Sequence, residues 1–307
     1  MSNILNRPSS EEAQALLSDL LQETEAWGGV LSGGKTRNSS ADAVDGLLKT
    51  RVTFGNPADK LIQLTVANFK ESGVKLTAIF EQQMQTQFDF YFMTLTVDLR
   101  PERGAKFWRL ICELDFGPKG SGEPIIQSLF PTHQWRSVMS HGVGMAVGLN
   151  GNLGWDVGVD TSGLKEVLGS IPGELKANVS SKDNFKAFLA VPDYQYELGK
   201  VEVVTTGEGN STCYWRIQDQ NIQKIGTAKF ALVFKVPKGT ESIVLKGIAW
   251  AEPNINWLTD ELGDVIAALP GRFQALLGQG DTASSKFARV APSEEWTLVL
   301  PKSFKAL

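Results

Sequence analysis

One stretch near the N-terminus carries the letters of a nucleotide-binding loop. Residues 29–36 read Gly-Val-Leu-Ser-Gly-Gly-Lys-Thr and match the P-loop pattern GxxxxGKS/T. A phosphate-binding loop needs a strand before it and a helix after it, because backbone N–H groups and the helix N-terminus hold the phosphates together. Here an amphipathic helix pattern precedes the loop, and residues 37–40 are a poor start for a buried helix. We therefore interpret residues 28–40, rich in Gly, Ser and Asn, as a linker.

Histidine and cysteine, which supply most metal ligands and many nucleophiles, are scarce in this chain. The histidines His133 and His141 and the cysteines Cys112 and Cys213 show no metal-ligand spacing, so we expect no metal site. Each cysteine shares a strand face with a nearby tryptophan. This placement favours two buried, reduced thiols in a cytosolic protein, with a disulfide between them as the alternative.

Carboxylates that could act as a catalytic pair occur in strand-like segments, at Glu81, Asp89, Asp98 and Asp115. No spacing selects two of them for glycosidase-type chemistry, and the GxSxG pattern of a nucleophile elbow is absent from the sequence. A catalytic role for His133 would need a nucleophile and a carboxylate that the sequence does not indicate. We therefore expect no catalytic, cofactor-binding or metal-binding residues and predict that the chain is not an enzyme.

One strand pattern occurs twice in the chain. The first copy reads Phe88-x-Phe90-x-Phe92-x-x-Leu95-x-Val97, and the residues Phe107-Trp108-Arg109-Leu110 follow it. The second reads Tyr194-x-Tyr196-x-Leu198-x-x-Val201-x-Val203, and the residues Tyr214-Trp215-Arg216-Ile217 follow it. Alternation with one change of parity predicts a strand with a β-bulge in each copy. We expect two related antiparallel units whose tryptophans pack in their cores.

An arginine follows the tryptophan in both copies, as Arg109 and Arg216. Adjacent residues of a strand point to opposite faces, so each arginine should point away from the face that carries the tryptophan. There it could pair with a carboxylate, cap a sheet edge or stack on an aromatic ring. The match between the copies favours one shared structural role over substrate binding.

The most unusual segment lies between the copies, at residues 141–160. Val143, Met145, Val147 and Leu149 alternate with small residues, and Leu153, Trp155, Val157 and Val159 alternate with Gly or Asp. The Asn-Gly pair at 150–151 predicts a type I′ turn, so the segment reads as a hairpin with one apolar and one nearly bare face. It could be a central hairpin of a sandwich. Alternatively, it could insert into a membrane as part of an oligomeric barrel, since open sheet edges are not tolerated in lipid.

Two helices and an early hairpin complete the expected elements. Residues 9–27 predict an amphipathic helix, with Ser9 and Glu12 as a capping box and an apolar stripe that packs on the protein's own sheet or docks to a partner. Residues 61–68 and 74–80 alternate and predict two strands of a hairpin. A second helix should start near Thr259 and be interrupted at Pro270.

Composition restricts the class of protein. The chain has 307 residues, of which 42% are hydrophobic and 21% charged, as in an ordinary globular protein. A net charge of −4 without basic clusters argues against nucleic acid as the partner. No run of 18 apolar residues occurs, and residues 1–14 lack the apolar core of a signal peptide, so we expect a cytosolic protein.

These observations predict a mostly-β, sandwich-like, antiparallel fold with an N-terminal and a C-terminal helix. We divide it into residues 1–46 (helix and linker), 47–160 (first β unit), 161–255 (second β unit) and 256–307 (helix and tail strand). The expected function is non-catalytic, a structural or protein-interaction module with a protein partner or a second copy of itself. A pore-forming protein that uses residues 141–160 is the first alternative, and an enzyme or nucleotide-binding module is the second.

Overall fold

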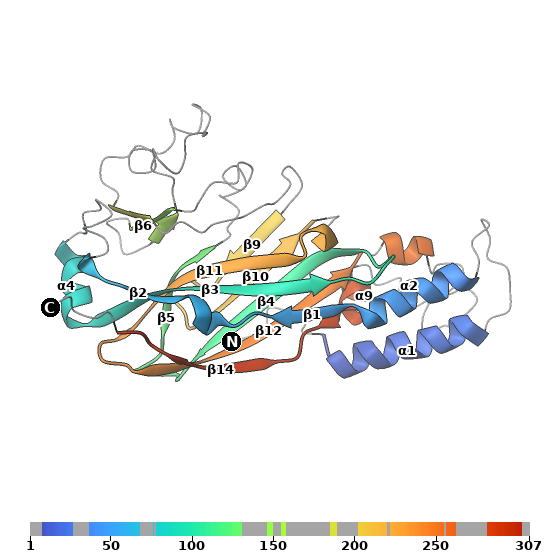
Figure 1. The fold of residues 1–307 in the computed structure, drawn as a ribbon, viewed down its shortest axis with the longest axis horizontal. Helices are drawn as coiled ribbons and strands as arrows, with labels where there is room; N and C mark the ends of the chain where they lie inside the picture. The colour runs from blue at the N-terminus through green and yellow to red at the C-terminus, as the bar shows by residue number, and fades with distance from the viewer. Residues whose placement is uncertain are drawn as a thin grey trace, which may run out of the picture.

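The computed structural model describes residues 8–26, 37–67, 76, 78–130, 146–149, 155–157, 185–188, 202–219, 222–254, 256–261 and 281–302. Two antiparallel sheets pack face to face along the long axis of the molecule, and helices lie at the ends (Figure 1). The predicted mostly-β, sandwich-like fold is confirmed. Within the described residues, no helix is long and apolar enough to cross a membrane.

The first sheet, called sheet A, has the order β1-β3-β11-β5, with β2 also paired to β3. Its strands are β1 (Arg51–Phe54), β2 (Leu61–Leu64), β3 (Phe88–Arg100), β5 (Ile125–Phe130) and β11 (Thr227–Pro237). Sheet B has the order β13-β12-β4-β10-β9, with β14 also paired to β12. Its strands are β4 (Phe107–Gly117), β9 (Glu202–Thr206), β10 (Thr212–Gln218), β12 (Ser242–Pro253), β13 (Arg289–Val290) and β14 (Glu294–Val299).

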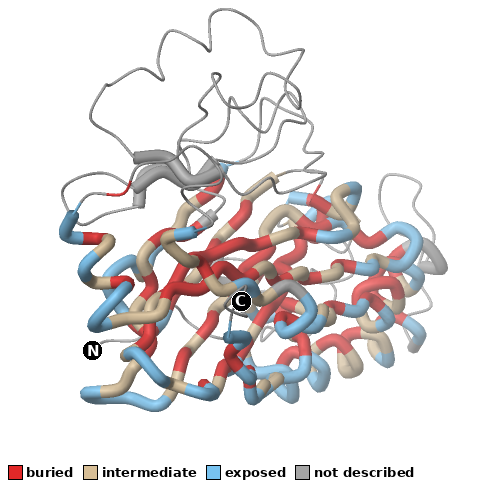
Figure 2. The backbone as a smooth tube through the Cα atoms, turned by 60° about the vertical axis from the view of Figure 1, so that its left-hand side comes forward, coloured by how far each residue is buried: buried red, intermediate tan, exposed pale blue. Residues whose placement is uncertain are grey.

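The core lies between the two sheets and follows from the alternation of the strands. On β4, Leu110, Cys112, Leu114 and Phe116 are buried in it, as the sequence predicts. Aromatic rings join the sheets: the centroids of Phe116 and Phe234 are 5.0 Å apart. Buried positions follow the strands through the interior, and exposed residues gather at the turns and outer faces (Figure 2).

Both sheets contain strands from both predicted units, with a strand of one unit inserted between strands of the other. In sheet A, β3 pairs with β11 over the whole length of β11. In sheet B, β4 lies between β10 and β12. The predicted units therefore meet along shared hydrogen-bonded ladders, and the residue boundaries between them stay a prediction.

The two tryptophans of the predicted repeat have different surroundings. Trp215 is fully buried, and its ring lies 4.9 Å from that of Phe230 in the core. Trp108, at the start of the adjacent strand, is only partly buried, and the guanidinium of Arg109 lies 4.1 Å from its ring centroid. The expectation that both rings pack in equivalent core positions is therefore wrong, because β12 pairs with Arg109 and Phe107 and skips Trp108, and Phe107 is the residue buried in the core there.

The bulge predicted in β3 is also wrong. The pairing of β3 with β11 runs without interruption from Phe88↔Pro237 to Asp98↔Thr227. The sequence changes parity because both faces of β3 are covered along Phe90–Met93, where all four side chains are buried. Phe90 lies on the outer face, and the centroid of its ring is 6.4 Å from that of Phe80 in helix α4 (Ala78–Thr86). The bulge predicted at residues 198–201 lies outside the described residues.

The predicted N-terminal helix is confirmed as α1 (Ser10–Ala26), where the Glu12 amide donates to Ser9 Oγ at 3.3 Å. Its apolar stripe packs within the chain, against helix α2 (Arg37–Lys49) and near α9 (Asp281–Lys286). Helix α2 corrects the prediction of a linker over residues 37–46. Its residues Ala43, Val44 and Leu47 are buried, so tertiary packing outweighs the weak helix start.

Two further sequence predictions are corrected by helices. Residues 78–80, predicted as part of a strand, begin α4 (Ala78–Thr86), in which Phe80 and Met84 lie four residues apart on one buried face. The helical residues 256–261 begin before the predicted start at Thr259, because Asn254 Oδ1 accepts from the Trp257 amide and caps the first turn. The interruption predicted at Pro270 lies outside the described residues.

Candidate functional site

The feature that stands out in the fold is a long insertion, residues 131–201, between the edge strands of the two sheets. It leaves sheet A after β5 and returns to sheet B at β9, and these two strands contact each other. The insertion contains a third sheet, called sheet C, of β6 (Ala146–Leu149), β7 (Trp155–Val157) and β8 (Phe185–Phe188). In Figure 1, β6 lies apart from the main sheets, on the side where β9 is labelled.

The predicted hairpin supplies two of the three strands of sheet C, with β6 in the middle. β6 and β7 are antiparallel, with Val147 opposite Val157, Leu149 opposite Trp155 and Gly148 opposite Asp156. This register places the apolar positions of both strands on one face of the hairpin and Gly148 with Asp156 on the other. The third strand, β8, pairs with β6. The expectation of a central sandwich hairpin is wrong, because neither β6 nor β7 pairs with a strand of sheet A or sheet B.

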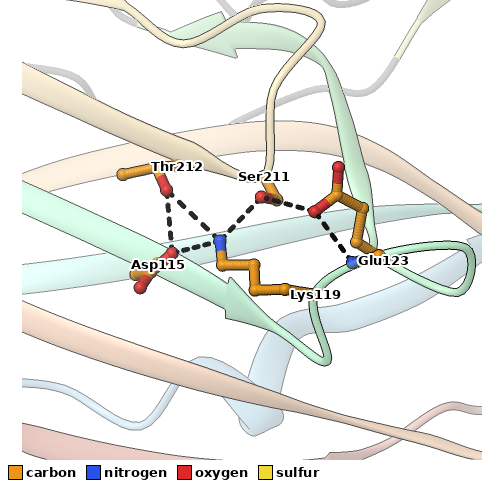
Figure 3. A network of polar contacts seen from close by, with 6 residues as sticks. Asp115, Lys119, Glu123, Ser211 and Thr212 are labelled. Carbon is orange, nitrogen blue, oxygen red and sulfur yellow. Dashed lines mark hydrogen bonds and ion pairs between the residues drawn. The ribbon is translucent and has the colours of Figure 1, made fainter. Parts of the chain in front are cut away.

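Polar side chains connect the turn before β5 with the turn after β9, at the ends of these strands opposite to those from which the insertion departs (Figure 3). Lys119, in the turn before β5, donates to Asp115 and, at 2.6 Å, to Ser211 Oγ in the turn after β9. Ser211 Oγ lies 3.3 Å from Glu123 Oε2, and Thr212 Oγ1 donates to Asp115 at 2.8 Å. Two backbone hydrogen bonds add to these contacts. The Ile126 amide of β5 donates to the Asn210 carbonyl, and the Gly209 amide donates to the Ile126 carbonyl. These contacts fix the two strands from which the insertion departs.

The close Lys119–Ser211 contact does not make a nucleophile and its base. The Lys119 ammonium is paired with the Asp115 carboxylate, so it donates and has no lone pair with which to accept the hydroxyl proton. Ser211 in turn reaches a second carboxylate, that of Glu123. The arrangement suits a structural connection between turns better than acyl transfer.

The two matched arginines both pair with a glutamate of a neighbouring strand. Arg109 Nη1 lies 2.8 Å from Glu252 Oε2, and both side chains are almost buried. Glu252 also accepts from Trp250 Nε1 and Ser285 Oγ, at 3.1 and 3.0 Å. Arg216 Nη2 lies 4.0 Å from Glu202 Oε1 in a more exposed setting. Pairing with a carboxylate, one of the three roles considered from the sequence, is therefore what both arginines show, and a shared structural role stays a prediction.

The candidate carboxylates are not brought together as a catalytic pair. Asp89 pairs with Lys238 at 3.3 Å, and Asp98 pairs with Arg100 at 3.2 Å and accepts from Thr227 at 2.7 Å. Asp115 belongs to the network around Lys119. Glu81 lies on helix α4, not on a strand. The described part of the chain holds no group of three or more His, Cys, Asp or Glu side chains that could bind a metal ion.

The remaining candidate residues have separate outcomes. Cys112 and Cys213 are free and buried, which confirms the prediction of two reduced thiols. Burial raises the pKa of both thiols above the ordinary value of 9.0, so neither is an activated nucleophile. His133, His141 and residues 29–36 lie outside the described residues. The P-loop string is preceded by helix α1 where a phosphate-binding loop would need a strand.

A cleft of about 650 Å³ lies between α2 and the turn that joins β3 to β4. Its charged residues have both signs, among them Asp42, Lys49, Glu102 and Arg103, and Lys49 pairs with Asp45 at 2.6 Å. Mixed, paired charges at an open surface do not select a ligand. No local sequence pattern predicts this cleft, since its lining comes from segments that are distant in the chain.

No family model matches the chain, and no curated protein matches it significantly. Solved structures match it over most of its length. A structure described as a pore forming protein is 8% identical, with coverage of 81% of this chain and 88% of that chain and a TM-score of 0.31. The Clostridium perfringens delta-toxin is 12% identical (coverage 80% and 92%, TM-score 0.26). The collagen-binding domain from a Staphylococcus aureus adhesin is 9% identical (coverage 69% and 88%, TM-score 0.24). At these scores the likeness carries no functional conclusion.

Proposed function

We propose that this chain is a non-catalytic, membrane-active protein that forms pores by self-association, with residues 131–201 supplying the strands that enter the bilayer. The observation that carries the proposal is the hairpin β6–β7. Its register gathers apolar positions on one face and Gly148 with Asp156 on the other. Such a dyad pattern is what a strand needs between lipid and an aqueous lumen.

The place of the hairpin in the fold supports this role. It belongs to an insertion between the edge strands of two packed sheets, so it can change its surroundings without breaking a ladder of either sheet. The contacts of Lys119 and Ile126 hold the roots of the insertion, β5 and β9, to the sandwich. The sandwich would then remain folded while the insertion refolds.

Self-association follows from the physics of the bilayer. A single hairpin leaves two open edges, and unsatisfied backbone groups are too costly in hydrocarbon. The smallest membrane barrels have about eight strands. One copy of the hairpin cannot close such a barrel, so several copies must contribute strands to one ring. A protein partner of its own kind is therefore part of the proposal.

Leakage of dye-loaded phosphatidylcholine liposomes tests the proposal with a matched pair of variants. Val147→Asp places a charge on the apolar face, where a lipid-facing charge opposes insertion most strongly near the bilayer centre, and should abolish release. Gly148→Asp places the same charge on the opposite face and should retain most of it. Equal leakage by both variants, or none by the unmodified protein at any pH or lipid composition, would contradict the proposal.

A second candidate is a protein-interaction module that does not enter membranes. Among the described strands, β14 pairs only with β12, and its Val299 is 76% exposed, the largest value for a large apolar side chain there. An exposed strand edge can accept a further strand from a partner. Val299→Lys should weaken such pairing. Unchanged partner capture and unchanged native mass for that variant would exclude β14 as the interaction site.

A further inference from the structure

The face of sheet A that points away from sheet B is buried over part of its area. Phe92, Ala231, Val233 and Ser128 are between 1% and 5% exposed, and none of them belongs to the core between the sheets. The register places Val233 opposite both Phe92 and Ser128, so the three lie side by side across three strands. We call these four residues the outer patch.

Helix α4 covers only one end of this face. Its Phe80 packs on Phe90, and Lys238 Nζ donates to the carbonyl of Met84, which fixes the helix above the start of β3. Ala231 and Val233 lie on the neighbouring strand β11, next to β5. Besides its neighbours β11 and β9, β5 contacts β7, the second strand of the hairpin. Figure 1 shows β6 on the same side of the molecule as α4.

We propose that, before membrane insertion, the apolar face of the hairpin β6–β7 docks on the outer patch and is hidden there from water. This inference rests on the proposed function. A hairpin with an apolar face long enough to enter lipid would leave a large exposed patch in water unless another surface covered it. The outer patch offers three apolar side chains and one hydroxyl without a charge, and the hairpin is joined to its edge strand β5.

Two features identify the hairpin as the segment that covers the outer patch: its connection to β5 along the chain and the polarity of its residues. The insertion begins where β5 ends, and its strand β7 contacts β5 at the edge of sheet A. Val147 and Val157, which face each other on the hairpin, match the patch in polarity. Membrane insertion then exchanges one apolar surface for another: the hairpin leaves the outer patch and enters lipid.

Thiol accessibility tests the docking in solution, without any membrane. In Ser128→Cys the new thiol lies in the outer patch, and Ile62→Cys is the matched control, because Ile62 is opposite Phe92 on the same sheet face but 48% exposed. The native Cys112 and Cys213 are buried and report whether the sandwich stays folded. We expect maleimide to modify Ser128→Cys at least about tenfold more slowly than Ile62→Cys.

Replacing residues 141–160 by a short Gly/Ser linker should then raise the rate at Ser128→Cys to about that of Ile62→Cys, while Cys112 and Cys213 stay protected. If this replacement does not fold, Val147→Asp serves as the second variant, since a charge on the docked face should release the hairpin. A Ser128→Cys thiol that stays protected in the folded variant, or that reacts fast in the full chain, overturns the docking.

The outcomes for docking and for pore formation are separable. If the linker variant exposes Ser128→Cys but the full chain releases no dye from liposomes, the docking stands and the proposed function fails. If the full chain releases dye and Ser128→Cys remains protected in the linker variant, the docking alone is overturned. Exposure of Ser128→Cys that appears together with dye release on adding phosphatidylcholine liposomes supports both.

Discussion

The two arginine–glutamate pairs of sheet B differ in burial, and this difference predicts how much each pair contributes to the free energy of unfolding. Arg109 stands directly opposite Glu252 on the paired strands β4 and β12, and the two side chains are 12% and 5% exposed. Glu252→Ala removes the carboxylate that accepts from Arg109, Trp250 and Ser285 and leaves a guanidinium buried without its counter-charge. Breaking a buried pair in this way costs about 3–5 kcal/mol of the free energy of unfolding.

The matched control is Glu202→Ala in the second pair. Glu202 lies 4.0 Å from Arg216, and the two side chains are 53% and 33% exposed, so water screens the interaction. We expect a loss of about 0–1 kcal/mol. Replacing both members of the buried pair, Arg109→Met with Glu252→Met, should recover part of the larger loss, because it removes the uncompensated charge.

Urea unfolding of the four proteins, followed by tryptophan fluorescence, measures the differences. The expected order of stability is unmodified protein, then Glu202→Ala, then the double variant, then Glu252→Ala. A loss for Glu252→Ala no larger than that for Glu202→Ala would refute the reasoning. It would mean that the Arg109–Glu252 pair is solvated or not formed.

Two further predictions concern the core and one turn. Because burial raises the pKa of Cys112 and Cys213 above 9.0, the folded protein keeps both protons where the unfolded chain loses them, so stability should fall as pH rises above about 9. Tyr91, whose pKa burial raises to about 12, adds to the fall above pH 10, and Cys112→Ala should flatten the pH profile of urea unfolding. Gly207→Ala should lower the free energy of unfolding by well over the roughly 1–2 kcal/mol that an alanine costs at positive φ. The reason is that the added Cβ would lie 2.4 Å from Cβ of Cys213. Gly209→Ala, with open space around it, should cost only that backbone strain, and equal losses for the two variants would contradict the close approach.

Local alternation was sufficient to predict the long strands. β4 and β12 bury one face each over most of their length, so their period of two is visible in the sequence. It failed in β3, where the second face is also covered, at one end by α4, and Phe90–Met93 are all buried. A change of parity has two causes, a bulge or a second covered face, and only the neighbouring strand and helix distinguish them.

The helices that the sequence did not predict owe their stability to distant contacts. Helix α2 begins with residues of weak helix propensity, and Ser40 Oγ donates to the carbonyl of Glu261, far along the chain. Helix α4 is short, and the ring of its Phe80 packs against Phe90 on β3. No local pattern encodes contacts of this kind.

The candidate site was predictable in part. The alternation predicts a hairpin within residues 141–160, which the pairing of β6 with β7 confirms. A two-residue turn at Asn150-Gly151 would pair Leu149 with Asn152, so the observed pairing of Leu149 with Trp155 does not bear out the predicted type I′ turn. The position of the hairpin outside the main sheets could not be predicted, because it depends on which strands form the edges of the sandwich. A cytosolic location stays a prediction, and the polar contacts of Lys119 had no sequence signal, since Ser211 lies 92 residues away.

The most direct test of the central claim is a fluorophore scan of the hairpin. An environment-sensitive label is attached in turn to Val147→Cys, Gly148→Cys, Asp156→Cys and Val157→Cys, with Cys112 and Cys213 protected by burial. On binding to phosphatidylcholine liposomes, labels at 147 and 157 should move to an apolar environment that lipid-confined quenchers reach, and labels at 148 and 156 should remain in water. Water-like emission at all four positions in membrane-bound protein would contradict insertion of the hairpin.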